Sequence, residues 1–235
     1  MVSVKAVKAE FQKVLDNISD IGNLYKKNEV KRTGKVENIN YAEIYAKHLL
    51  NNNYYLKLFQ IQHYNRNNYR VHGRVESNTK KPKYKRLEDL FARKLYKNKV
   101  NLGDLGQPFY YQVPLKENMG SKGGGKIDLV SIFGKKVIYL IELKYGENKE
   151  SLLRAVLEVH TYYQRLNPKN FINSFPEIKG VKLNNIKKAV LLGPETKAYI
   201  EARNLNSPGM SNFKELIKKL NVGIFYYAPE RVPLL

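Results

Sequence analysis

Three charged side chains stand in two segments that predict neighbouring strands, and their types are those of hydrolytic chemistry. Asp128 lies near the start of IDLVSIF (127–133), and Glu142 and Lys144 lie near the end of VIYLIELKYG (137–146). Because side chains alternate along a strand, Glu142 and Lys144 share one face. Both faces of this strand are otherwise apolar, and buried charges are costly unless they are paired or metal-bound. The pattern therefore indicates that these charged residues form a functional site.

The connection between the two segments predicts that Asp128 and Glu142 meet. Only the tripeptide GKK (134–136) separates them, and so short a connection joins antiparallel strands. Asp128 should then pair approximately with residues 141–143. Two carboxylates at that separation favour a divalent cation, because without one they repel each other. Lys144 lies within reach of a metal-bound water, and this combination suits phosphodiester hydrolysis.

A glycine-rich segment, MGSKGGGK (119–126), precedes the first of these strands. Its spacing is that of a phosphate-binding loop, but Ile127 stands where Ser or Thr would bind Mg²⁺. A strand also comes directly after this segment, whereas a phosphate-binding loop opens a helix. We therefore expect a turn beside the sheet that lets a phosphate backbone approach closely, and no nucleotide-binding loop.

The elements around the charged residues predict an α/β (α+β) fold with a mixed central sheet flanked by helices. Apolar spacing in LEDLFARKLYKN (87–98) predicts a helix whose buried face carries Leu87, Leu90, Phe91 and Leu95. Further helices are predicted over 2–18, 41–50 and 149–166, strands over 108–115, 127–133, 137–146, 186–193 and 221–228, and a hairpin within 54–76. The basic, proline-containing segment TKKPKYKR (79–86) predicts a boundary between an N-terminal extension (1–80) and the main domain (81–235).

Asp128, thirteen intervening residues and then Glu142-Leu143-Lys144 resemble the motif of the PD-(D/E)XK nuclease superfamily. The resemblance covers roughly residues 85–230 and implies a restriction-endonuclease-like core of helix, three-stranded meander, helix and strand. It departs from the family pattern at Ile127, where the motif has proline. The resemblance implies that Asp128 and Glu142 hold Mg²⁺ or Mn²⁺, with the carbonyl of Leu143 as an extra ligand. Lys144 would position or activate the attacking water.

An acidic residue of the preceding helix often completes the site in this superfamily, and Glu88 is the matching residue, with Asp89 as the fallback. The alternative interpretation of Glu88 is a helix N-terminal charge favoured by the macrodipole.

The segment EVHTY (158–162) resembles the Gln-apolar-x-x-Tyr motif of the RecB-type branch, with Glu158 in place of Gln. Glu158, Tyr162 and Gln164 are therefore accessory candidates, while His160 is interpreted as structural. However, the apolar stripe of this helix directs Glu158 away from the main core, so a surface salt bridge with Arg154 is the alternative.

The chain carries 42 Lys and Arg against 21 Asp and Glu, a formal net charge of +21. Such a charge attracts polyanions, with nucleic acid ahead of anionic membranes, although an inert basic surface is the alternative. We expect phosphate contacts that bring affinity without sequence reading. The candidates are Lys80, Lys81, Lys83, Lys85, Arg86, Lys122 and Lys126.

The absence of cysteine excludes disulfides and thiolate metal sites. No apolar run approaches the ~20 residues of a membrane-spanning helix, so a soluble, cytoplasmic protein is expected. The sequence thus predicts a metal-dependent nuclease acting on nucleic acid, DNA ahead of RNA. The alternatives are a non-catalytic nucleic-acid-binding protein of the same fold and a basic protein-interaction module. The oligomeric state is open, and a homodimer is compatible with the sequence.

Overall fold

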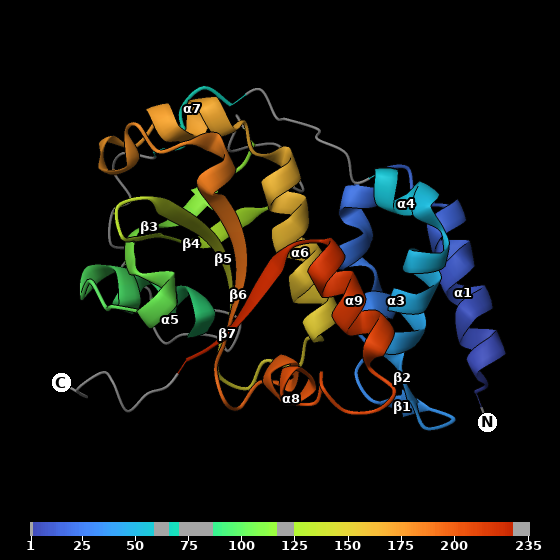
Figure 1. Ribbon diagram of the computed structural model, residues 1–235. Coiled ribbons are helices and arrows are strands. Elements are labelled where there is room, and N and C mark those ends of the chain that lie inside the picture. The colour runs from blue at the N-terminus through green and yellow to red at the C-terminus, as the bar shows by residue number, and fades with distance from the viewer. Residues whose placement is uncertain (1, 59–65, 71–86, 117–124, 228–235) are drawn as a thin grey trace, which may run out of the picture.

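The computed structural model describes residues 2–58, 66–70, 87–116 and 125–227. Its centre is a five-stranded sheet in the order β3-β4-β5-β6-β7. The strands are β3 (Gln107–Pro114), β4 (Lys126–Phe133), β5 (Val137–Lys144), β6 (Ile186–Leu192) and β7 (Val222–Tyr226). The first three are antiparallel, and β6 and β7 run parallel to β5. Helices flank this mixed sheet, as the sequence predicted (Figure 1).

The GKK connection forms the tight turn that its length predicts. Gly134 and Lys135 both have positive φ, 58° and 56°, and the amide of Lys136 donates to the carbonyl of Phe133 at 3.1 Å. Two consecutive residues of positive φ make a turn whose twist matches that of paired strands. The turn therefore holds β4 against β5, with Phe133 opposite Val137.

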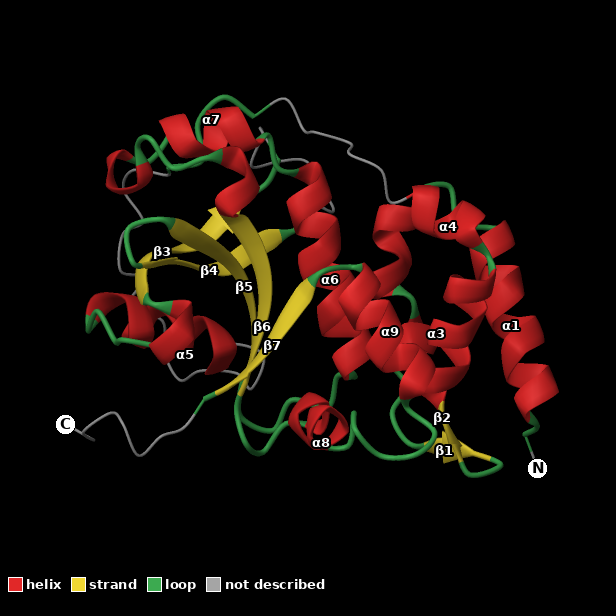
Figure 2. Ribbon diagram, in the orientation of Figure 1, coloured by secondary structure: helices red, strands yellow, loops and turns green. Residues whose placement is uncertain are grey.

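Each face of the sheet is covered by a helix that flanks the hairpin in sequence. Helix α5 (Leu87–Lys97) packs Phe91, Ala92 and Leu95 against one face. Leu90, predicted on the buried side, is instead 43% exposed, because the helix turns its contact face toward Ala92. Helix α6 (Leu152–Arg165) covers the opposite face, and Figure 2 shows the sheet between the two helices.

The N-terminal elements pack on the outer side of α6 and share one apolar cluster with it and with the sheet. Their order is α1 (Val4–Asp16), η1 (Ile21–Lys26), α2 (Asn28–Lys31), β1 (Lys35–Val36), β2 (Ile39–Asn40), α3 (Tyr41–Asn51) and α4 (Asn53–Leu58). Helix α9 (Ser211–Lys219) lies beside α3 although the two are far apart in sequence (Figure 1). The predicted boundary at 79–86 lies outside the described residues.

The hairpin predicted within 54–76 is wrong at its start, where α4 is helical. Tyr55 explains the difference: its ring is buried, and its hydroxyl bonds Gln12 and Asp16 of α1. This tertiary contact favours a helical turn over a β-rich local sequence. Residues 59–65 and 71–76 of the predicted hairpin lie outside the described residues.

Shorter elements connect the main ones. They are η3 (Gly103–Leu105), α7 (Pro168–Asn173), η4 (Pro176–Ile178), η5 (Leu183–Asn185) and α8 (Lys197–Arg203). In the part of the chain that the structure describes, no helix has the length and apolar composition needed to cross a membrane.

Candidate active site

Asp128 closes the ladder between β4 and β5 at the end away from the turn. The paired residues run from Phe133 and Val137 to Leu129 and Ile141. Beyond them, the amide of Leu143 donates to Oδ2 of Asp128 at 2.9 Å. The carboxylate thus takes a main-chain donor that points toward β4. Since N–H and C=O of one residue point to the same strand edge, the Leu143 carbonyl also faces this side.

Glu142 and Lys144 form a buried ion pair on the α6 face of the sheet. Their exposed fractions are 4% and 2%, and Nζ of Lys144 donates to Oε1 of Glu142 at 2.7 Å. The same ammonium donates at 2.7 Å to Oε2 of Glu150, which precedes α6. It also lies 3.6 Å from Oε2 of Glu158. The structure therefore pairs the two charges that the strand pattern placed on one face.

Glu158 belongs to this cluster, and the expectation that it points away from the core is wrong. It is 7% exposed, and its Oε1 accepts a hydrogen bond from the Tyr162 hydroxyl at 2.7 Å. Its predicted partner Arg154 does approach it, with Nε 3.6 Å from Oε2, but in a buried setting rather than on the surface. Arg154 also pairs with Glu150. Glu158 and Tyr162, two of the accessory candidates, therefore lie beside Lys144.

Helix α6 is buried on a second side because N-terminal elements cover it. The ring of Tyr25 in η1 lies edge-on to Tyr162, with centroids 5.8 Å apart. The hydroxyl of Ser151, the residue that caps α6, bonds the carbonyl of Val30. Gly125 completes the enclosure, because a Cβ there would lie 2.1 Å from the Tyr162 ring. This close approach is one reason for a glycine at the end of the glycine-rich segment.

Glu88 lies in the first turn of α5, close to the end of β5. Its Oε1 accepts hydrogen bonds from the amide of Tyr145 at 3.2 Å and from the side chain of Asn148 at 2.6 Å. Asn148 in turn accepts from the amide of Glu150 at 2.7 Å. Glu88 thus holds the loop that carries Glu150 and contacts the cluster indirectly. Asp89, the fallback, is exposed.

Carboxylates outnumber cations in this cluster, and burial and neighbouring charge determine the pKa values. Burial raises the pKa of Asp128 to about 7, although the charge of Lys144 acts to lower it. Burial also raises the pKa of Glu142 well above its ordinary value. Burial also raises the pKa of Glu88. Burial alone would lower the pKa of Lys144, but the surrounding carboxylates raise it far more. Lys144 is therefore a permanent cation among carboxyl groups, of which Asp128, Glu142 and Glu88 hold their protons more tightly than usual.

The donor set fits a small divalent cation held by few protein ligands. Among the described residues, no group of three or more His, Cys, Asp or Glu side chains is arranged to hold a metal ion. The ammonium of Lys144 occupies the centre of the acidic cluster instead. However, Mg²⁺ needs only one or two carboxylates when water and substrate phosphate complete its shell. Asp128 and Glu142 are the carboxylates that would hold it, and the buried Oε2 of Glu158 makes no hydrogen bond within the described structure.

Two site residues were missed from the sequence. Gln112 donates from Nε2 to Oδ1 of Asp128 at 3.3 Å, and its φ of 52° is unusual for a residue other than glycine. Glu150 could have been found by its spacing of four from Arg154. Gln112 carries no such signal, because its backbone conformation is visible only in the structure.

Gln164 and His160 make their hydrogen bonds away from the cluster. Gln164 contacts His160 at 3.4 Å, and the other ring nitrogen of His160 lies 3.1 Å from Nζ of Lys188. Gln164 is six residues beyond Glu158, about 9 Å along the helix. His160 is buried. Lys126 is exposed at the start of β4, whereas Lys80, Lys81, Lys83, Lys85, Arg86 and Lys122 lie outside the described residues.

Comparison with models of protein families, with curated proteins and with solved structures finds no significant match. The function of this protein is therefore inferred from its own residues and their geometry.

Proposed function

We propose that this protein is a divalent-metal-dependent nuclease that hydrolyses phosphodiester bonds of nucleic acid, DNA ahead of RNA. One observation carries the proposal: the carboxylates of Asp128 and Glu142 stand on paired strands beside the buried ammonium of Lys144. The net charge of +21 supports a polyanionic substrate. The resemblance to the PD-(D/E)XK superfamily adds that this trio is of the kind that holds Mg²⁺ or Mn²⁺.

A divalent cation bound by Asp128 and Glu142 would polarise the scissile phosphate and lower the pKa of a bound water. The protein's own residues supply orientation and charge. The Leu143 amide holds the carboxylate of Asp128 against the strand edge, and Gln112 restrains its other oxygen. The carbonyl of Leu143 is available on the same edge as an additional oxygen donor.

Lys144 acts as a cation and not as a general base in this proposal. The neighbouring carboxylates raise its pKa, so its ammonium stays protonated at neutral pH. A fixed positive charge stabilises the negative charge that develops on a phosphoryl group, and it does so strongly in a site shielded from water. Two of its N–H groups are donated to Glu142 and Glu150, and the third can orient the attacking water.

Glu158 and Tyr162 act as positioning residues. The Tyr162 hydroxyl bonds one oxygen of Glu158, whose other oxygen lies near both Lys144 and Arg154. Burial alone would raise the pKa of Glu158, but the charges of Lys144 and Arg154 lower it, which keeps the carboxylate ionised. Glu88 anchors the loop after β5 from the opposite side. Together they keep Lys144 in one orientation.

A second candidate function is nucleic-acid binding without turnover. The observation in its favour is that Lys144 already neutralises Glu142 and Glu150, so the cluster is partly satisfied without a metal. In that case the trio would be a structural ion network, and the basic surface alone would act. Divalent metal separates the two candidates, because a ligand that binds only the folded state stabilises it.

The deciding experiment is a cleavage assay with labelled single-stranded, duplex and branched DNA and with RNA. Each substrate is incubated with Mg²⁺, with Mn²⁺ and with chelator, using the native protein, Asp128→Asn and Lys144→Ala. Lys218→Ala, at an exposed position on α9, is the matched control. The nuclease proposal requires metal-dependent cleavage by the native protein and the control, and none by the two site variants. Absence of cleavage under all conditions would favour the binding protein.

A further inference from the structure

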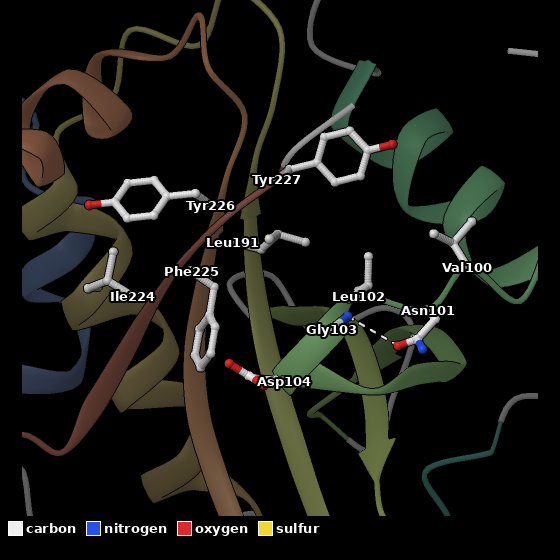
Figure 3. Close-up of a pocket in the computed structure, with 10 residues that line it drawn as sticks. All are labelled: Val100, Asn101, Leu102, Gly103, Asp104, Leu191, Ile224, Phe225, Tyr226 and Tyr227. Atoms are coloured by element: carbon white, nitrogen blue, oxygen red, sulfur yellow. Dashed lines mark hydrogen bonds between the residues drawn. The ribbon is translucent and has the colours of Figure 1, made fainter. Parts of the chain in front are cut away.

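A pocket of about 370 Å³ lies on the α5 side of the sheet, between β7 and the loop after α5 (Figure 3). It is lined by Val100, Asn101, Leu102, Gly103, Asp104, Leu191, Ile224, Phe225, Tyr226 and Tyr227. The pocket takes in none of the site residues named above. Its volume is in the range of small-ligand sites.

The pocket has aromatic walls and one carboxylate. Phe225 and Tyr227 are two residues apart and project from the same face of β7 and its continuation, with Leu191 of β6 between them (Figure 3). The opposite wall is a loop held by its own hydrogen bond, from the amide of Gly103 to Oδ1 of Asn101 at 3.1 Å. Asp104 is exposed on that loop and lines the pocket. Such a cavity suits a flat ring that carries hydrogen-bond donors at one edge.

A chain of aromatic contacts connects the pocket to the candidate active site. Tyr227 lies edge-on to Tyr145, with ring centroids 6.4 Å apart. Tyr145 comes directly after Lys144, stacks on Phe91 with centroids 3.6 Å apart, and donates its amide to Glu88. Both sites lie at the carboxyl ends of the parallel strands, where open α/β sheets bind their ligands. The pocket and the trio lie on opposite faces of the sheet, so a nucleotide chain that occupies both would pass around the carboxyl ends of the strands.

We propose that this pocket binds one unpaired base of the nucleic-acid strand that is cleaved at the Asp128, Glu142 and Lys144 site. The inference rests on the proposed function and adds that the substrate is single-stranded at this position. Phe225 and Tyr227 offer ring surfaces on which any base can stack. Lys187 places a basic side chain on the same side of the sheet. It pairs with Tyr139 of β5, and the rings of Tyr139 and Phe225 have centroids 5.8 Å apart.

The carboxylate of Asp104 determines which base the pocket should prefer. An ionised carboxylate only accepts hydrogen bonds, so it pairs with amino groups and ring N–H groups and repels phosphate. Guanine presents a ring N–H and an amino group on one edge and can donate to both carboxylate oxygens. Thymine and uracil present one donor between two acceptors. The pocket should therefore prefer guanine among the bases and disfavour thymine.

The test is equilibrium binding of labelled single-stranded oligonucleotides in the presence of chelator, so that no cleavage occurs. Three strands of equal length are compared: thymine throughout, thymine with one central guanine, and thymine with abasic positions. The variants are Phe225→Leu and Asp104→Asn. Their matched controls are Phe133→Leu, at an aromatic that is 44% exposed on the hairpin, and Glu195→Gln, at an exposed carboxylate. Circular dichroism verifies that each variant is folded.

We expect the abasic strand to bind about tenfold more weakly than the thymine strand, and Phe225→Leu to remove this difference. The central guanine should strengthen binding, and Asp104→Asn should abolish that gain while the two controls retain both effects. Equal affinity for abasic and base-containing strands would overturn the proposal. The proposal would also be overturned if the central guanine still strengthened binding in Asp104→Asn. This second variant tests the pocket even if Phe225→Leu does not fold. Binding of free guanosine monophosphate that oligonucleotides do not compete away would also overturn it.

Failure of the base site and failure of the nuclease proposal give different results. Metal-dependent cleavage with base-independent binding leaves the nuclease and removes the pocket from its substrate path. Base-dependent binding lost in the pocket variants, with no cleavage in any metal, leaves the base site on a non-catalytic binding protein.

Discussion

Asp128 bonds the amide of Leu143, the residue that stands between Glu142 and Lys144 on the neighbouring strand, at 2.9 Å. One main-chain hydrogen bond thus joins the first acidic residue to the centre of the Glu-Leu-Lys segment. Because a main-chain donor cannot rotate away, the position of Asp128 relative to both charged side chains depends on the strands themselves. This relationship makes substitutions at Asp128 informative.

Asp128→Asn keeps an acceptor for the Leu143 amide and removes the negative charge. We expect it to lose the increase in melting temperature that Mg²⁺ or Mn²⁺ confers on the native protein, while stability in chelator changes by less than about 1 kcal/mol. Asp128→Ala should cost an additional ~1–3 kcal/mol, because it leaves the buried amide without an acceptor. Thermal and denaturant unfolding measure both effects. A metal-induced gain that survives in Asp128→Asn would place the metal elsewhere.

Lys144→Ala should abolish cleavage and leave nucleic-acid binding nearly intact. In chelator it should also destabilise the protein by about 3–5 kcal/mol, because Glu142, Glu150 and Glu158 lose the cation that they share. Millimolar Mg²⁺ should restore part of this loss, since a divalent cation can replace the ammonium. Denaturant unfolding with and without metal is the measurement, and Lys218→Ala should match the native protein. Unchanged cleavage would remove Lys144 from the mechanism.

Two substitutions at Gln112 separate the effect of its backbone conformation on stability from the effect of its side chain on cleavage. Its φ of 52° lies in the left-handed region, where a β-branched residue is disfavoured. We expect Gln112→Val to cost about 1–2 kcal/mol. Gln112→Gly relieves the backbone but removes the amide that restrains Asp128, so it should lower the cleavage rate without lowering stability. Equal rates for the native protein and Gln112→Gly would show that the restraint is unimportant.

Glu201 makes stability depend on pH. Its carboxylate accepts from the amide of Leu152 at the start of α6, and burial raises its pKa from 4.5 to about 7. The folded state then binds the proton more tightly than the unfolded state. The contribution of Glu201 to stability should be greatest below pH 4.5 and fall, by on the order of 3 kcal/mol, as the pH rises toward 7. Glu201→Gln should remove this contribution and leave the one from Asp128, whose pKa is also raised to about 7. Glu195→Gln, at an exposed carboxylate, should leave the profile unchanged.

Binding of nucleic acid should weaken steeply as salt rises. Each phosphate contacted by Lys or Arg releases a counterion, so the logarithm of the binding constant falls linearly with that of the salt concentration. Equilibrium binding in chelator over a range of salt concentrations gives the slope. A flat response would contradict phosphate contacts as the source of affinity and would favour the basic protein-interaction module.

Short-range geometry explains why the central trio was predictable. The period of two in a strand places Glu142 and Lys144 on one face, and the three-residue turn places Asp128 beside them. Neither step requires knowledge of distant residues. The helices at 41–50 and 149–166 were predictable for the same reason, since their apolar spacing is local.

Glu158 was misplaced because its surroundings come from elsewhere in the chain. The apolar stripe of α6 accounts for the side that packs on the sheet. The other side is covered by η1 and α2, and Tyr25 reaches Tyr162 from there. The start of the predicted hairpin at 54 failed similarly, because Tyr55 joins a polar cluster with Gln12 and Asp16 of α1.

The sequence by itself determined the hairpin, its register and the three charged residues it brings together, since turn length and strand alternation act over a few residues. Only the tertiary structure decided which further groups join them. Glu150 and Glu158 meet Lys144, and Gln112 of β3 restrains Asp128, because a loop, a helix and a further strand converge on the β4–β5 hairpin. That convergence depends on packing between distant segments, and no local pattern records it.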